Sequence, residues 1–188
     1  MVAALFGLEV FLITALIFLA VAMASSAFGD APFVPTGNSS VRKIMEIVRV
    51  KPGEIFYDLG SGDGRLVRAA ARAGARAYGF ERVRLLALWG NLLPRLQGMG
   101  DRAVGRRGNF FAENFGDADI VFVYLFPEAM IRLEEKCRRE LKPGARVISR
   151  AFTFPGWPPE AVFRFGKYNP PLYVYRKTAT VAPEAFLS

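Results

Sequence analysis

The stretch DLGSGDG at residues 58–64 carries three glycines at alternate positions and begins with an acidic residue. Residues 54–59 (EIFYDL) form a short apolar run typical of a buried strand, and residues 64–73 have a helical pattern. Glycines between a strand and a helix allow a sharp turn and let a ligand approach the backbone. The stretch therefore predicts a strand–turn–helix unit that binds a ligand.

Strand-like and helix-like segments alternate on both sides of this unit. Strands are predicted at residues 54–59, 76–81, 103–111, 119–126, 145–152, 161–167 and 172–177, and helices at residues 41–50, 64–73, 83–96 and 127–141. Nearly every position of DIVFVYLF at residues 119–126 is apolar, as burial on both faces of a sheet requires. The pattern predicts an α/β fold. We expect a Rossmann-like, mostly parallel seven-stranded sheet with helices on both faces and a C-terminal antiparallel hairpin.

The acidic residues around the loop indicate the kind of ligand. Glu81 ends the predicted second strand, 21 residues after Gly60. An acidic residue about 20 residues beyond such a loop is placed to accept hydrogen bonds from ribose hydroxyls. Asp58 and Asp63 would repel a pyrophosphate but attract a ligand that bears an ammonium and a sulfonium. The pattern thus favours S-adenosylmethionine over a dinucleotide.

The Asp-x-Gly-x-Gly-x-Gly loop followed by Glu81 resembles the class I S-adenosylmethionine-dependent methyltransferases over residues 41–177. The resemblance implies S-adenosylmethionine as cofactor, a loop that holds its methionyl part, and Glu81 on its ribose. In this family an acidic or amide residue after the third strand lies beside the adenine, and Gly108-Asn109-Phe110 matches that feature loosely. The cofactor-binding residues that the resemblance implies are Asp58, Gly60, Ser61, Gly62, Gly64, Glu81, Asn109 and Phe110.

Four short stretches resemble a narrower, membrane-anchored group of protein-lysine methyltransferases. They are PFVPT at residues 32–36, DLGSGDGR at residues 58–65, YLFPE at residues 124–128 and PGWPP at residues 155–159. Mitochondrial members of that group modify the ADP/ATP carrier and the c-subunit of ATP synthase. The resemblance implies transfer of a methyl group to a protein lysine at a membrane, but the acceptor itself does not carry over.

The family's motif after strand four borders the transferring methyl, and YLFP at residues 124–127 stands at that place. A lysine amine has an ordinary pKa of about 10.4, and burial in an aromatic pocket would lower it. We therefore expect Phe33, Tyr124 and Phe126 to line the acceptor site and Glu128 to orient the amine. The alternatives are that Tyr124 and Phe126 are core aromatics and that Glu128 stabilises the start of a helix.

Residues 2–24 (VAALFGLEVFLITALIFLAVAMA) form an apolar run interrupted only by Glu9. A helix of this length spans about 30 Å, the thickness of a bilayer core, which predicts one transmembrane helix. The alternative is a cleaved signal peptide, since the run ends on small residues, although no Lys or Arg precedes it. Glu9 is expected near a membrane interface, with a partner inside the membrane as the alternative.

The predicted organisation is a membrane anchor over residues 1–28, a linker or ordered loop over residues 29–40, and a methyltransferase domain over residues 41–188. The chain has a formal net charge of +8, and four basic residues follow the apolar run between residues 42 and 51. The positive-inside rule then predicts a single-pass membrane protein with its catalytic domain in the cytoplasm. Its basic charge would attract anionic lipid.

The chain contains no histidine and one cysteine. This excludes an internal disulfide, a zinc site built from His and Cys, and every mechanism with a histidine base. Methyl transfer from a sulfonium needs neither metal nor histidine, so no metal is expected. The arginines at 102, 106 and 107 indicate a solvated face more than a nucleic-acid site. We expect protein-lysine methylation, with a lipid-soluble small-molecule acceptor or a non-catalytic, membrane-tethered binding module as alternatives.

Overall fold

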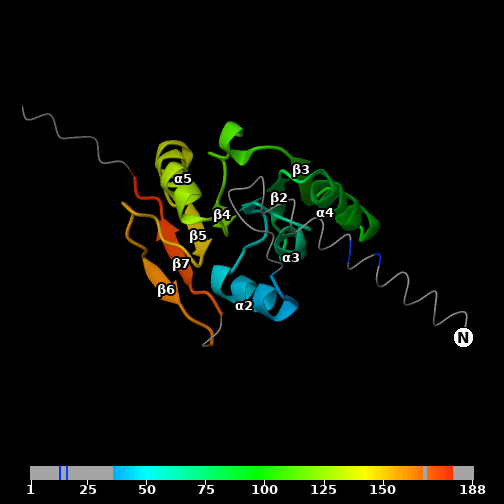
Figure 1. Ribbon diagram of the computed structural model, residues 1–188, viewed down its shortest axis with the longest axis horizontal. Helices are drawn as coiled ribbons and strands as arrows, with labels where there is room; N and C mark the ends of the chain where they lie inside the picture. The colour runs from blue at the N-terminus through cyan, green and yellow to red at the C-terminus, as the bar shows by residue number, and fades with distance from the viewer. Residues whose placement is uncertain (1–12, 14–15, 17–35, 167–168, 180–188) are drawn as a thin grey trace, which may run out of the picture.

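The computed structural model describes residues 13, 16, 36–166 and 169–179. The described residues form a seven-stranded sheet in the order β3-β2-β1-β4-β5-β7-β6 (Figure 1). The strands are β1 (Ile55–Leu59), β2 (Arg76–Glu81), β3 (Ala103–Arg107), β4 (Ile120–Val123), β5 (Arg146–Arg150), β6 (Ala161–Phe163) and β7 (Leu172–Arg176). The helices are α2 (Asn38–Val48), α3 (Arg65–Arg72), α4 (Arg84–Leu96) and α5 (Pro127–Glu140), with a 3-10 helix, η1, at Phe110–Ala112.

Strands β1 to β5 run parallel, whereas β7 pairs antiparallel with both β5 and β6. The mostly parallel sheet and the antiparallel C-terminal pair predicted from the sequence are therefore confirmed. The strand order reverses between β1 and β4, and ligands of open parallel sheets bind at the carboxyl ends of the strands beside such a reversal. This topology places the loop after β1 at the expected binding edge.

Alternate residues along the strands supply two hydrophobic clusters, one on each face of the sheet. Phe56 of β1 packs with residues of α2 and α3, such as Ile44 and Leu66, whereas Tyr57 packs with residues of α5, such as Leu133. Helices therefore cover both faces (Figure 1). Burial on both sides holds β1 and the loop that follows it at the centre of the domain.

Several predicted boundaries differ from the structure. The strand predicted to extend to residue 111 ends at Arg107, because Asn109 Oδ1 accepts a hydrogen bond from the Phe111 N–H and caps η1. The strand predicted to extend to residue 126 ends at Val123, where the chain leaves the sheet. Helix α2 begins at Asn38, with the Gly37 carbonyl accepting from the Val41 N–H at 3.0 Å. The helix predicted to begin at residue 41 therefore starts three residues earlier.

No helix among the described residues is long and apolar enough to span a membrane. The predicted transmembrane run at residues 2–24, including Glu9, lies outside the described residues except for Ile13 and Leu16. These two are helical and 59% and 72% exposed. The membrane anchor, its orientation and the boundaries of the anchor and linker stay predictions.

Candidate active site

The loop between β1 and α3 bends at three glycines. Gly60, Gly62 and Gly64 have φ values of 86°, 55° and 74°, a region that residues with a Cβ rarely adopt. The backbone N–H groups of Gly60 and Ser61 both donate to the Phe80 carbonyl at 2.9 Å, which ties the loop to the end of β2. The shape of this loop therefore depends on its glycines.

The loop is tight on its inner side and open at Gly60. A Cβ on Gly79 of β2 would lie 2.6 Å from Ser61 Oγ, so β2 and the loop fit only without a side chain there. In contrast, a Cβ on Gly60 would meet only Leu125 Cδ2, at 3.5 Å, and Gly60 itself is exposed. A ligand can therefore reach the backbone at Gly60 without displacing protein.

Glu81, the last residue of β2, lies directly beside the loop. Its Oε2 accepts a hydrogen bond from the Gly62 N–H at 2.9 Å, and its Oε1 accepts from the Val83 N–H at 2.8 Å. A carboxylate has about four acceptor positions, so Glu81 retains capacity for further donors such as ribose hydroxyls. The structure brings Glu81 and the glycine loop together.

Asp58, the penultimate residue of β1, is buried at 4% exposure. Burial, followed by the negative charges of Glu81 and Asp63, raises its pKa to about 8. No described residue donates a hydrogen bond to its carboxylate, which is a costly arrangement for a buried acid. A ligand with a positive charge would compensate it, so the site fits a cationic cofactor better than an anionic one.

Asp63 has a different environment. Its carboxylate accepts from Arg65 Nη2 and Nε at 2.8 and 2.9 Å. Burial favours the protonated acid, but the hydrogen bonds and charge of Arg65 outweigh it and hold the pKa of Asp63 below its ordinary value. The attraction expected between Asp63 and a cationic ligand is offset by Arg65, with which Asp63 is already paired at 2.8 Å. Arg65 also donates to the Thr36 carbonyl at 2.6 Å, so it joins the segment before α2 to the loop.

The residues after β3 lie at the same edge of the sheet. The Gly108 N–H donates to the Glu81 carbonyl at 3.1 Å, which places exposed Asn109 close to the end of β2. Phe110, in contrast, is 4% exposed and packs in the core, with its ring centroid 4.5 Å from that of Phe111. Of the two residues implied beside the adenine, only Asn109 presents its side chain to solvent.

The segment after β4 places three expected acceptor-site residues at this edge. Tyr124 is half-buried, Phe126 precedes α5 and is 37% exposed, and Glu128 is exposed in the first turn of α5. Leu125 lies between the two aromatic residues but turns inward. Phe126 is therefore not a core aromatic residue. Phe33 lies outside the described residues.

Comparison with known proteins identifies the family. The model of the ANTKMT methyltransferase domain matches residues 58–161, from Asp58 to the start of β6. The chain belongs to this methyltransferase family. A protein-lysine N-methyltransferase of Saccharolobus islandicus is 36% identical over 150 residues, which cover 77% of this chain and 92% of that relative. The family comprises lysine N-methyltransferases that depend on S-adenosylmethionine.

Two mammalian relatives are named for the proteins on which they act. The lysine N-methyltransferase of the ATP synthase c-subunit from Homo sapiens is 34% identical over 131 residues, which cover 70% of this chain and 56% of that protein. The adenine nucleotide translocase lysine N-methyltransferase of Mus musculus is 36% identical over 138 residues, with 71% and 58% covered. The match thus spans little more than half of either mammalian relative.

A solved structure supports the cofactor. The RNA methyltransferase from Salinibacter ruber, in complex with S-adenosyl-L-homocysteine, has a TM-score of 0.74 and 30% sequence identity to this chain. The match covers 80% of this chain and 98% of that one. S-adenosyl-L-homocysteine is the demethylated form of S-adenosylmethionine, which is the cofactor of this methyltransferase family.

Arg150 was not predicted from the sequence, yet it lies at the active-site edge of this methyltransferase. It ends β5, is 6% exposed, and donates from Nη1 to Thr36 Oγ1 at 3.2 Å. Its guanidinium lies 5.3 Å from the Tyr124 ring centroid, and its Nε has no hydrogen-bond partner among the described residues. Burial lowers its pKa. The sequence feature that could have indicated Arg150 is a charged residue at the end of an otherwise buried strand.

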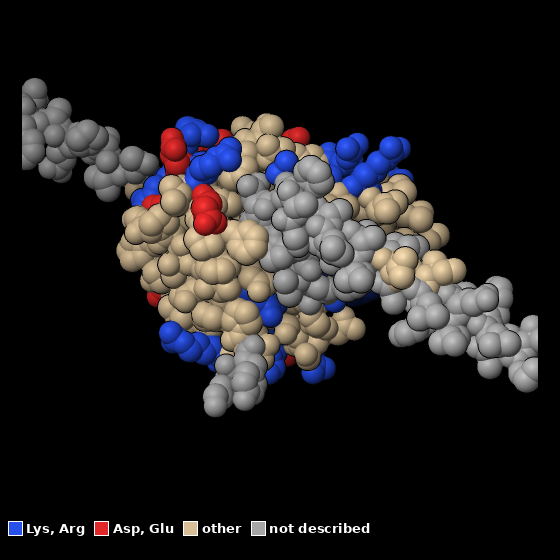
Figure 2. Space-filling model, in the orientation of Figure 1, with Lys and Arg blue, Asp and Glu red and all other residues tan. Residues whose placement is uncertain are grey.

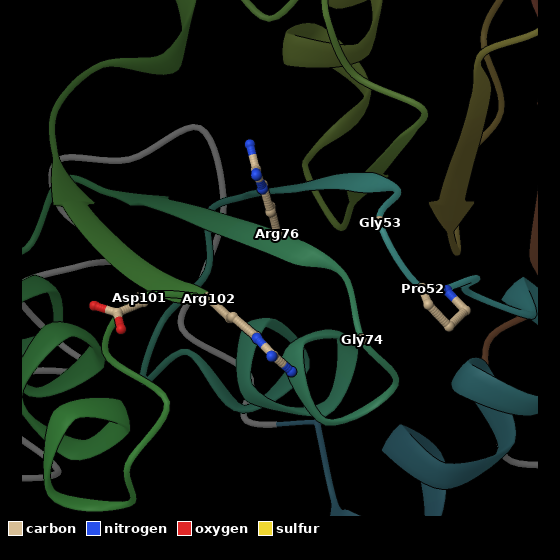
Figure 3. A pocket seen from close by; sticks show the side chains of 6 residues that line it. All are labelled: Pro52, Gly53, Gly74, Arg76, Asp101 and Arg102. Carbon is tan, nitrogen blue, oxygen red and sulfur yellow. The ribbon is translucent and has the colours of Figure 1, made fainter.

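A hollow of about 510 Å³ lies at the opposite edge of the sheet (Figure 3). Its lining residues come from the loops that precede β1, β2 and β3 and from the first residue of β2: Pro52, Gly53, Gly74, Arg76, Asp101 and Arg102. The glycine loop and Glu81 instead follow β1 and β2. The hollow contains none of the expected site residues, so it is separate from the methyltransferase site.

Proposed function

We propose that this methyltransferase transfers methyl groups from S-adenosylmethionine to a lysine ε-amine of a protein at a membrane. The observation that carries the acceptor class is the 36% identity to a protein-lysine N-methyltransferase across 92% of that relative. The two mammalian relatives, named for a component of ATP synthase and for a nucleotide translocase, favour a membrane protein as substrate.

In this proposal the glycine loop holds the cofactor's methionyl part and Glu81 accepts hydrogen bonds from the ribose. Asp58, buried and without a cationic partner among the described residues, faces the positive charge of the cofactor. Asn109 lies beside the adenine, and the buried Phe110 anchors η1, which follows Asn109, in the core. The loop residues assigned to the cofactor are Gly60, Ser61, Gly62 and Gly64. When bound, the cofactor supplies an electrophilic methyl group on its sulfonium.

The acceptor site is assigned to the segment after β4. Tyr124 and Phe126 would line the path of the lysine side chain, with Phe33 as a further aromatic residue assigned from the sequence. Glu128 is exposed in the first turn of α5 and would orient the approaching ammonium. An aromatic lining lowers the pKa of the lysine and so increases the fraction of neutral amine, the form that attacks the methyl group.

The membrane placement rests on the apolar run at residues 2–24 and on the basic residues that follow it. We propose a single-pass protein with its catalytic domain on the cytoplasmic side. A tether of this kind confines the enzyme and a membrane-protein substrate to the same surface, which raises their effective concentration.

A second acceptor class is RNA. The similarity to the RNA methyltransferase of Salinibacter ruber favours it, as do the exposed arginines at 102, 106 and 107. The lipid-soluble acceptor and the non-catalytic binding module are the remaining alternatives.

Labelling separates these acceptors. Membranes that contain the full chain are incubated with S-adenosylmethionine carrying a labelled methyl group, and protein, RNA and lipid fractions are counted separately. We expect label in the protein fraction, and Glu81→Ala as the control should abolish it. Label confined to RNA or lipid would contradict the lysine proposal, and no transfer to any fraction would favour a binding module.

A further inference from the structure

The outward face of α4 carries large apolar side chains where a surface helix ordinarily carries polar ones. Leu85, Leu88, Trp89, Leu92 and Leu96 are 60, 62, 51, 42 and 72% exposed. Their spacing of three, one, three and four residues places them on one side of the helix. We call these five residues the α4 stripe. Single exposed leucines are common, but a contiguous apolar patch of this kind marks an interaction surface.

The inward face of α4 explains why the stripe stays outside. It consists of the small residues Ala87, Gly90 and Pro94. A Cβ on Gly105 of β3 would lie 2.9 Å from the Gly90 carbonyl carbon, so the helix backbone rests directly on the sheet. A Cβ on Gly64 would lie 3.3 Å from Gly90 Cα, so α4 also touches the glycine loop. The close packing leaves no space for the large side chains on the inner side.

Positive charge surrounds the stripe. Helix α4 contains no acidic residue, and Arg84 and Arg95 are exposed near its two ends. Exposed Arg102 and Arg107 lie next to or in β3, on which α4 packs, whereas Arg106 points to the other face of the sheet, over the rings of Tyr78 and Phe80. None of these five arginines forms an ion pair with a described residue. Figure 2 shows several basic side chains on the side where α4 and β3 lie in Figure 1, with others on the side of α5.

We propose that the α4 stripe docks onto the anionic surface of a lipid bilayer. Leucine and tryptophan on one face with arginine at its borders are typical of helices that lie in the membrane interface, where tryptophan is enriched. Anionic lipid headgroups are complementary in charge to the arginines. A protein partner would need acidic side chains opposite the arginines and also an apolar groove that fits the α4 stripe. This inference rests on the membrane placement in the proposed function, since the apolar run at residues 2–24 would hold α4 close to the bilayer.

Docking through α4 also orients the active site. The helix follows Glu81 directly and crosses back over β2 and β3, so its N-terminal end lies at the edge that holds the glycine loop. With the stripe on the membrane, this edge lies at the level of the headgroups. The substrate class that fits is a lysine in a segment close to the membrane surface.

The two tryptophans of the chain provide a direct test. Trp89 belongs to the α4 stripe, whereas Trp157 packs against Phe154 and Tyr175, with ring centroids 5.7 and 5.5 Å away. The full chain is reconstituted in vesicles of equal parts dibrominated phosphatidylcholine and phosphatidylglycerol. In Trp157→Phe, the remaining Trp89 fluorescence should be strongly quenched relative to unbrominated vesicles. In Trp89→Phe, the fluorescence of Trp157 should change little. Equal quenching of both tryptophans would overturn the proposal.

A charge in the stripe sharpens the test. Leu88→Glu in the Trp157→Phe background should reduce the quenching of Trp89, because a carboxylate opposes contact with anionic lipid. The matched control is Ile131→Glu, which changes an equally exposed apolar residue of α5, 61% against 62%, and should leave the quenching unchanged. Unchanged quenching in Leu88→Glu would contradict docking. If neither brominated lipid nor aqueous iodide quenches Trp89, a second copy of the chain or another segment covers the α4 stripe. That result would also overturn the docking proposal.

Activity measurements separate this inference from the proposed function. Leu88 is not assigned to the cofactor or acceptor site, so Leu88→Glu should still bind S-adenosylmethionine, which also reports an intact fold. If Trp89 is not quenched but lysine methylation persists, only the docking inference fails. If Trp89 is quenched but no lysine is methylated, only the proposed function fails.

Discussion

Glu81 Oε2 accepts a hydrogen bond of 2.9 Å from the Gly62 N–H, so the acid that ends β2 holds the glycine loop that follows β1. The other oxygen of the same carboxylate accepts from the Val83 N–H before α4. One side chain thereby fixes the loop, the end of a strand and the start of a helix. A ligand that contacts Glu81 meets an acid that is already oriented.

Glu81→Gln is expected to weaken S-adenosylmethionine binding by about ten- to a hundredfold. Hydrogen bonds to a charged group contribute about 1.5–3 kcal/mol, and the amide would also point an N–H group at a backbone N–H donor. Calorimetric titration of both proteins measures the change. Glu128→Gln is the matched control, because Glu128 lies on the acceptor side and its loss should leave cofactor affinity unchanged. Equal affinities of wild type and Glu81→Gln would contradict the assignment.

Cofactor binding is expected to release a proton from Asp58. Its pKa is raised to about 8 without ligand, so about nine tenths of the protein carries this proton at pH 7. A cationic ligand favours the ionised carboxylate and lowers the pKa. The apparent affinity should therefore rise with pH up to about 8. Titrations in buffers with different ionisation enthalpies measure the release, which Asp58→Asn should abolish. Binding without proton release would contradict a cation beside Asp58.

The same acid is expected to lower the stability of the ligand-free protein. The folded state binds the Asp58 proton more tightly than the unfolded state, since the pKa is raised from 3.8 to about 8. Stability from this group is therefore fully present below the ordinary pKa and is lost as the pH rises to about 8. Asp58→Asn should have the higher free energy of unfolding at pH 8, and the difference should shrink towards pH 4. Urea unfolding at both pH values checks this, and an Asn variant that is less stable at pH 8 would be the opposite result.

Gly79→Ala is expected to destabilise the fold by about 1–3 kcal/mol, the range for overpacked cores. The new Cβ would lie 2.6 Å from Ser61 Oγ and 2.8 Å from Val67 Cγ2, so the glycine loop and α3 must shift. Gly37→Ala is the control, because a Cβ at Gly37 would have no neighbouring atom within 4 Å and the φ of this residue is −56°. Denaturant unfolding compares the two, and equal stabilities would show that β2 and the loop are not tightly fitted.

Methionine substitution of the two arginines of β5 is expected to have different effects on protein stability and on the rate of methyl transfer. Arg150→Met should leave stability nearly unchanged, because it removes a buried charge with an unsatisfied Nε. It should lower methyl transfer, because it removes the contacts of Arg150 with Tyr124 and Thr36 at the active-site edge. Arg146→Met should destabilise, because Arg146 Nη2 pairs with Glu54 at 3.1 Å. Thermal unfolding and methyl-transfer rates measure both effects. A large stability loss with Arg150→Met would indicate a structural role instead.

The glycine loop and Glu81 were predictable because each is set by nearby sequence. Three glycines after an apolar strand specify the bend, and the alternation of strands and helices places Glu81 at the same edge of the sheet. Arg150 and Thr36 could not be paired in this way, since 114 residues separate them and neither belongs to a local motif. Long-range contacts between side chains require the fold itself.

The faces of α4 and the burial of Phe110 were also beyond the sequence pattern. Leucines at helical spacing ordinarily face the core, but in α4 the residues that contact the sheet are small ones such as Gly90. Similarly, Phe110 and Phe111 are adjacent aromatic residues, and only the geometry of η1 decides which is buried. In both cases the composition of the segment does not indicate which of its residues face the core.

The most direct test of lysine methylation is mass spectrometry of membranes treated with S-adenosylmethionine that carries a trideuterated methyl group. The account predicts deuterated methyl groups on the ε-nitrogen of a lysine in a membrane protein with the wild-type chain, and a strong reduction with Glu81→Gln. Deuterium found on no lysine while RNA or lipid becomes labelled would contradict it.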